Sequence, residues 1–314
     1  MPSDADTMFC PDIENEEQEK KEYLWRQQQR GYEQMLRIAD GETPEQVYGS
    51  ALLSRAFRLE GVKHYFGCMD GRIQKKDKKD QWESKIGIGA NGRLLDDLLF
   101  EKLVQQIRTV FEQILHRNPA WLKVTYHAKC GACTKYCNDT NPRRTELRLP
   151  AMNPVQAGKQ IADKLMQNLH IKGDPVFIPS NWMEGDEHWH PERSVAIDTT
   201  GVSRPKELGD RERGYHPSTF ELSGIFYPTL EHLEKETRIA IGIALDEHHG
   251  MGERFTNEGG ENRLLLPIYE DPTNPELVEG IRRIIDPIGE EFEDRVLPVH
   301  FPVPEQHVRN AHQD

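Results

Sequence analysis

Apolar residues recur at helical spacing in several parts of the chain. The clearest run covers residues 93–118 and ends before Pro119, and one face of it stays apolar through Leu94, Leu95, Leu98, Leu99, Leu103, Ile107, Val110, Phe111 and Ile114. The pattern predicts further helices over residues 16–38, 44–59, 153–169 and 274–293. The second of these begins with a capping-box pattern, in which Thr43 is the N-cap, Pro44 takes the first helical position and Gln46 closes the box.

Short apolar segments between these helices predict strands. They cover residues 62–66, 84–92, 120–127, 174–183, 237–250, 263–270 and 295–304, and residues 192–200 are interpreted as a hairpin partner of 174–183. The order strand, loop, strand, helix, strand indicates parallel strands joined by helical crossovers. We therefore expect an α/β fold with a mainly parallel central sheet flanked by helices and an N-terminal helical arm.

Three segments follow from this pattern. Residues 1–60 form a tail and the helical arm, residues 61–200 form an α/β catalytic core, and residues 201–314 form a C-terminal α/β extension packed on the same core. The extension either completes the same sheet or forms a pseudo-repeat that lacks metal ligands.

Charge and composition narrow the function classes. The 314 residues carry a net charge of -13, which disfavours nucleic acid because phosphate binding needs clustered Lys and Arg. We find no apolar run long enough to cross a bilayer and no secretory signal, so we expect a cytoplasmic protein without membrane insertion.

The chain has five cysteines, and around them lies its highest density of potential metal ligands. Three of them lie with a histidine in the segment HAKCGACTKYC, residues 127–137. An odd, clustered set without a signal peptide favours metal or redox chemistry over a disulfide framework.

A distant cysteine completes a metal-ligand set. Cys68 and Asp70 follow the first predicted strand, and His127 and Cys130 follow the third. Because ligands gather beyond the carboxyl ends of parallel strands, both pairs are expected at one edge of the sheet. Two thiolates and one imidazole are three of the four ligands that Zn²⁺ prefers, and the open fourth position is typical of a catalytic site. We expect Asp70 and Arg72 to form an ion pair near the metal, which is suited to orienting a bound water.

The pattern C-x-D-x-R followed by H-x-x-C resembles the β-class carbonic anhydrases. This resemblance implies that Cys68, His127 and Cys130 bind zinc, and that Asp70 and Arg72 act as the catalytic dyad. It also implies reversible hydration of CO2 to bicarbonate by a zinc-bound hydroxide, in a homodimer. The chain departs from the family where residues 87–93 read GIGANGR and where Ala132 replaces a glycine, so the expected substrate pocket differs.

Two other functions stay open. A zinc hydrolase acting on carbonyl sulfide or carbon disulfide would use the same site. A non-catalytic metal- or redox-sensing protein would instead use Cys130, Cys133 and Cys137 as its functional cluster, or Cys130 and Cys133 as a redox pair.

The histidine-rich segments DEHWHPE, residues 186–192, and DEHHG, residues 246–250, are interpreted as structural or surface segments. A proton shuttle at His248 or His249 is the functional alternative, because imidazole titrates near neutrality.

Overall fold

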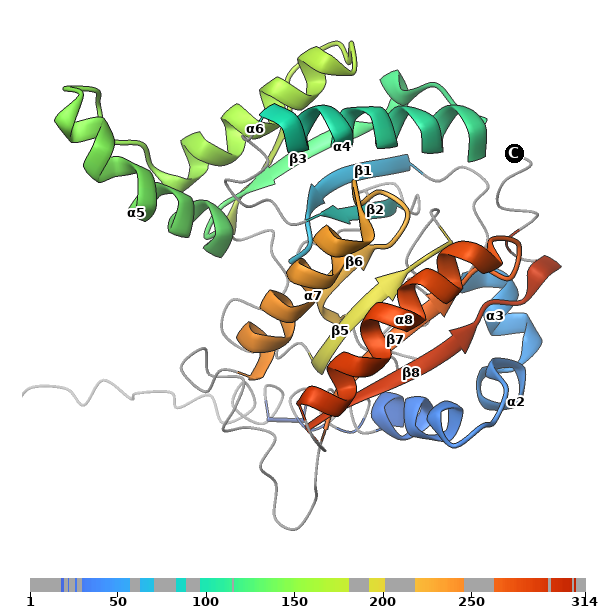
Figure 1. Cartoon of the computed structure of the whole chain (residues 1–314). Coiled ribbons are helices and arrows are strands. Elements are labelled where there is room, and N and C mark those ends of the chain that lie inside the picture. The colour runs from blue at the N-terminus through green and yellow to red at the C-terminus, as the bar shows by residue number, and fades with distance from the viewer. Residues whose placement is uncertain are drawn as a thin grey trace, which may run out of the picture.

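Two parallel β-sheets with helices packed on them make up the α/β fold of this chain (Figure 1). The structure is a computed structural model, and it describes residues 30–56, 63–70, 83–88, 97–114, 116–180, 192–200, 218–245, 263–292, 295–306 and 308, with residues 18, 19, 22 and 26. The predicted fold class is confirmed, although the strands are divided between two four-stranded sheets rather than one.

The first sheet has the strand order β2-β1-β3-β4. Its strands are β1 (Lys63–Cys68), β2 (Glu83–Ile88), β3 (Lys123–His127) and β4 (Val176–Ile178). The accompanying helices are α4 (Asp97–Thr109), the π-helical turn η2 (Val110–Ile114), the 3₁₀ turn η3 (Pro119–Trp121), α5 (Gly131–Glu146) and α6 (Pro154–Asn168). All three strand pairings are parallel, as the crossover pattern predicted.

The second sheet repeats this arrangement, with the strand order β6-β5-β7-β8. Its strands are β5 (Glu192–Asp198), β6 (Ser218–Ser223), β7 (Leu264–Glu270) and β8 (Val296–Pro302), again all parallel, and its helices are α7 (Leu230–Leu245) and α8 (Pro275–Glu291). In matching positions, β1 ends at Cys68 and β5 at Asp198, while β3 ends at His127 and β7 at Glu270. The second half therefore presents carboxylates where the first half presents a thiol and an imidazole.

The two halves contact each other through the segment that follows β1. Asp70 forms an isolated antiparallel bridge with Phe220 of β6, and the backbone N–H of Glu221 donates to the carbonyl of Met69 at 2.8 Å. On the helix side, Gln106 donates to the carbonyl of Ile225 at 2.7 Å. Residues 220–225 of the C-terminal half thus contact the Met69–Asp70 segment and α4, and they hold the segment that follows Cys68 in place.

Two clusters of buried apolar side chains hold the layers together. The larger cluster runs from β1, α4, α5 and α6 into α7 and α8, so the two halves share one core. The smaller cluster joins the N-terminal helices to the other face of the second sheet. These helices are residues 30–39, α2 (Pro44–Tyr48) and α3 (Ser50–Ala56), and Figure 1 shows α2 and α3 beside β8. The helical arm therefore packs on the C-terminal strands.

Several predicted elements differ from the observed ones. Thr43 and Gln46 form the expected capping box, but Gly49 (φ 81°) splits the predicted helix into α2 and α3. Leu98, expected on the buried face of α4, is 68% exposed. The strand predicted over residues 237–250 is wrong up to residue 245, because that segment belongs to α7. The hairpin predicted for residues 192–200 is also wrong, because β5 pairs in parallel with β6 and β7.

Some predictions lie outside the described residues. They concern Arg72, the end of the second predicted helix at residues 57–59, residues 89–92 of the glycine-rich segment, the start of the helix predicted over 93–118, and both histidine-rich segments except Glu192. Among the described helices, none is both long enough and apolar enough to cross a membrane. The homodimer stays a prediction.

A charge network centred on the buried carboxylate of Glu270 joins β7, α8 and β8 in the second half. Arg282 donates to both carboxylate oxygens of Glu270, from Nε at 2.6 Å and from Nη2 at 2.5 Å. His300 places Nδ1 2.8 Å from Glu270 Oε1 and Nε2 3.2 Å from Asp286 Oδ1. The hydrogen bond to Glu270 raises the pKa of His300, although burial opposes it. Burial would raise the pKa of Glu270, but the hydrogen bonds from His300 and Arg282 outweigh it and lower that pKa.

This network predicts a pH-dependent stability. The pKa of His300 in the folded protein lies above its ordinary value of 6.5. The contribution of protonated His300 to the free energy of unfolding is therefore fully present below pH 6.5, and it is lost as pH rises through the folded pKa. Urea unfolding of the parent and of His300→Gln should therefore show a difference in unfolding free energy that is largest in mildly acidic buffer and shrinks toward alkaline pH. A difference that stays constant between the two conditions would contradict a charged His300.

Candidate metal centre

The site is assembled from the ends of two adjacent parallel strands. Cys68 is the last residue of β1 and His127 is the last residue of β3, and these strands pair with Phe66 opposite Val124. After His127 the backbone turns through Lys129, whose φ of 55° is in the left-handed region, and Cys130 becomes the N-cap of α5. This turn returns the chain toward the strand end, so Cys130 lies beside the other two side chains.

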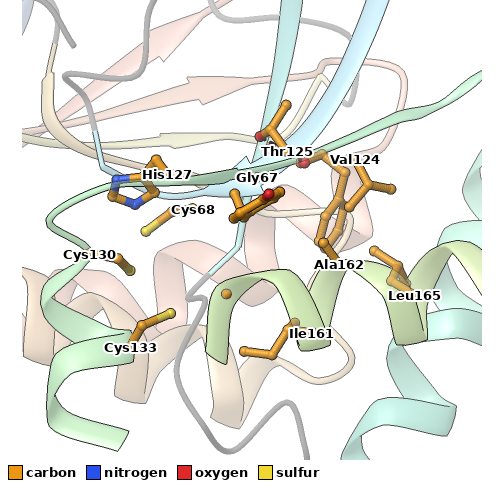
Figure 2. A pocket seen from close by; sticks show the side chains of 13 residues that line it. Gly67, Cys68, Val124, Thr125, His127, Cys130, Cys133, Ile161, Ala162 and Leu165 are labelled. Atoms are coloured by element: carbon orange, nitrogen blue, oxygen red, sulfur yellow. Dashed lines mark hydrogen bonds between the residues drawn. The ribbon is translucent and has the colours of Figure 1, made fainter. Parts of the chain in front are cut away.

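Cys68, His127 and Cys130 form a compact group that can bind a metal ion. Their ligand atoms all lie within 4.8 Å of one another, and all three residues are buried. Figure 2 shows the sulfur atoms of Cys68 and Cys130 beside the His127 ring, at one end of a cavity. The prediction that both sequence pairs meet at one edge of the sheet is thus confirmed for these three residues.

The His127 ring is oriented for metal binding. Its Nδ1 lies 2.7 Å from the carbonyl oxygen of Ala128, and because a carbonyl only accepts, Nδ1 carries the proton in this contact. In the neutral ring Nε2 then has a free lone pair, and this atom is buried without a hydrogen bond among the described residues. A backbone acceptor on the distal nitrogen is the usual support for a metal-binding histidine.

The electrostatics of the group also favour a bound cation. The hydrogen bond with Cys130 and burial raise the pKa of the Cys68 thiol. The hydrogen bond with Cys133 and burial raise the pKa of Cys130 to about 12, although the hydrogen bond with Cys68 opposes them. Burial lowers the pKa of His127, but the interaction with Cys68 and the charge of Asp70 outweigh it and raise that pKa. Two thiolates therefore cannot both form here unless a cation compensates their charge, which a metal ion does while releasing protons.

Asp70 is the remaining described member of the predicted catalytic set. It is 8% exposed, and its bridge to Phe220 fixes its backbone beside the site. Its negative charge acts on His127, which places the carboxylate within electrostatic range of the group. The predicted ion pair with Arg72 stays a prediction.

A small cavity adjoins the three ligands. It has a volume of about 30 Å³, which holds about two water-sized molecules at roughly 10–15 Å³ each. Its walls come from β1, β3, α5 and α6 and are lined by Phe66, Gly67, Cys68, Val124, Thr125, Tyr126, His127, Cys130, Cys133, Gly158, Ile161, Ala162 and Leu165. Most of these side chains are apolar, so away from the ligands the cavity suits a small uncharged molecule.

Tight packing between β1 and β3 keeps this corner rigid. A Cβ on Gly67 would lie 2.3 Å from Thr125 Oγ1, so only glycine fits at position 67, directly before Cys68, with this backbone. Thr125 Oγ1 in turn donates to the carbonyl of Phe66 at 3.2 Å. The residue immediately before the first ligand is therefore locked against the strand that carries the second.

Two parts of the site were not predicted from the sequence. Helix α5 was not predicted, and it carries Cys133 and Cys137 as buried side chains. Helix α6 was predicted, but nothing in its apolar pattern indicated that Gly158, Ile161, Ala162 and Leu165 face the ligands across a cavity.

Comparison of the chain with protein-family models, with curated proteins and with solved structures finds no match.

Proposed function

We propose that Cys68, His127 and Cys130 hold Zn²⁺ and that the protein catalyses the reversible hydration of CO2. The observation that supports this most is the convergence of two thiols and one imidazole, all buried, at the end of a small apolar cavity. Sulfur and imidazole donors together favour zinc over the harder cations, which prefer oxygen ligands.

Three protein ligands would leave the fourth coordination position of the zinc ion open. Zinc held by three protein ligands keeps an open position and acts as a Lewis acid that lowers the pKa of water to about 7. Cys133, the third cysteine at the cavity, lies outside the group of three, which supports the proposal of an open site over a closed Cys₃His site.

The cavity wall and Asp70 are suited to CO2 as a substrate. The cavity wall formed by Phe66, Val124, Ile161 and Leu165 offers an apolar surface to a neutral molecule of three atoms. Asp70 lies two residues beyond Cys68 and its charge acts on His127, and in this proposal its carboxylate accepts a hydrogen bond from the reacting water. That hydrogen bond would keep the lone pair of the water oxygen directed at the substrate carbon.

Stopped-flow measurement of CO2 hydration by the zinc-loaded protein tests the proposal. The parent should be active, and Asp70→Asn should keep its zinc while the rate falls by about 10²- to 10⁴-fold, the range typical for loss of a proton-handling group. If the zinc-loaded parent shows no CO2 hydration between mildly acidic and alkaline pH, the CO2 assignment is wrong. Turnover of carbonyl sulfide by the same sample would then assign the site to that analogue.

A further inference from the structure

A second thiol lies directly against one of the candidate ligands. Cys130 is the N-cap of α5 and Cys133 follows three residues later, so the pair forms a C-x-x-C motif at a helix N-terminus. Both side chains are 2% exposed, neither is in a disulfide, and the hydrogen bond between them contributes to the raised pKa of Cys130. Figure 2 shows both residues at the same end of the cavity.

The surroundings of Cys133 hold its sulfur at the cavity wall. A Cβ placed on Gly158 of α6 would lie 3.6 Å from Cys133 Sγ, so the sulfur packs against a helix backbone on that side. On the other side it contacts Cys130, and both residues line the cavity. Cys133 is thus held beside a ligand while it stays outside the group of three ligands.

Disulfide geometry is compatible with this pair. Side chains three residues apart at a helix start have Cβ atoms about 5–6 Å apart, and a disulfide brings them to about 3.5–4.5 Å. A small local adjustment therefore closes the bond. The alternative disulfide between Cys130 and Cys68 would join two residues that both bind the metal. Cys133, in contrast, hydrogen-bonds to Cys130 and is not one of the three ligands.

We propose that Cys130 and Cys133 form a reversible disulfide that removes Cys130 from the ligand set. The consequence for the metal rests on the proposed zinc site, and the disulfide itself does not. A peroxide is the oxidant class that fits, because hydrogen peroxide is only slightly larger than a water molecule and the cavity has room for about two waters.

The reaction balances as two thiols and one hydrogen peroxide giving one disulfide and two waters. One sulfur attacks a peroxide oxygen, the O–O bond breaks, and a sulfenic acid and the first water result. The second sulfur attacks the sulfenic sulfur, the S–O bond breaks, and the second water leaves as the S–S bond forms. The cysteines lose two electrons and two protons, and the peroxide gains them.

The test uses the zinc-loaded full chain, exposed to hydrogen peroxide. Zinc release is followed with a colorimetric chelator, and the disulfide is located by peptide mass mapping. Cys133→Ala removes the pair, and Cys137→Ala is the matched control, because it removes another buried thiol of the same helix. The parent and Cys137→Ala should release zinc with a Cys130–Cys133 disulfide and should rebind zinc after reduction with dithiothreitol. Zinc release from Cys133→Ala should be about tenfold slower, since no neighbouring thiol resolves the oxidised sulfur.

Equal zinc release from Cys133→Ala and the parent, or a disulfide that maps to Cys68 and Cys130, would overturn the proposal. The outcome is independent of the catalytic assignment, because neither readout involves CO2. If the chain binds no zinc, mass mapping of the oxidised protein still decides whether Cys130 and Cys133 pair, and only the proposed function is lost.

Discussion

Replacing Cys68 with serine should lower the zinc affinity of the protein by more than about 100-fold and abolish CO2 hydration. Changes to residues that merely support a ligand already cost about 10–100-fold in metal affinity, so loss of one of three ligands should cost more. Cys68→Ser removes a soft donor from a buried group in which the other two ligands sit within 4.8 Å of it. Metal analysis after dialysis should show about one zinc per chain in the parent and almost none in the variant.

Cys137→Ala is the matched control for this experiment. Cys137 is buried on α5 like Cys133, but it lies outside the group of three ligands and does not line the cavity. This variant should keep the zinc content and the rate of the parent. Full zinc occupancy in Cys68→Ser would show that the metal is bound by other ligands.

Replacing Gly67 with alanine should destabilise the protein by about 1–3 kcal/mol, the usual cost of an extra methyl group in tight packing. The new Cβ would lie 2.3 Å from Thr125 Oγ1, and both residues belong to strands whose positions are fixed by the sheet. Because Gly67 precedes Cys68 directly, relief of this clash must move the first ligand. Urea unfolding should therefore show a lower free energy of unfolding, and metal analysis should show weaker zinc binding.

A second substitution tests the cause of this effect. Thr125→Ala removes the clashing oxygen, and the next nearest side-chain atom to the new Cβ is Thr125 Cβ at 3.7 Å, an ordinary contact distance. The double variant Gly67→Ala/Thr125→Ala should thus be less destabilised than the sum of the two single changes. Gly158→Ala is the matched glycine control, since its Cβ would meet its nearest neighbour at 3.4 Å. Additive single effects would show that the clash with Thr125 is not the cause.

The ligand group could be predicted because its members follow from simple rules. Cys68 and His127 lie at the ends of two strands that the apolar pattern marked clearly, and parallel strands bring such ends to one edge. Cys130 is only three residues from His127, so its position follows from theirs. The identities of these three residues and the order of the predicted strands were therefore enough to predict that residues about sixty positions apart in the chain lie close together.

Other elements were missed for physical reasons. Helix α5 is polar and contains Pro142, so its sequence lacks the apolar stripe that marked α4 and α6. The apolar run of α7 has alternating residues in its second half that imitate a strand. Its buried residues nevertheless recur at helical spacing from His232 to Ala244. The way in which the two sheets contact each other depends on long-range pairs such as the bridge between Asp70 and Phe220, which join residues far apart in the chain.

X-ray absorption at the zinc edge of the metal-loaded protein tests the central claim most directly, because it counts the donor atoms around the ion. With Cys68, His127 and Cys130 as ligands, we expect two sulfur atoms at about 2.3 Å, one histidine nitrogen at about 2.0–2.1 Å and one further light atom. A first shell with three or four sulfur atoms, or with none, would contradict this ligand set.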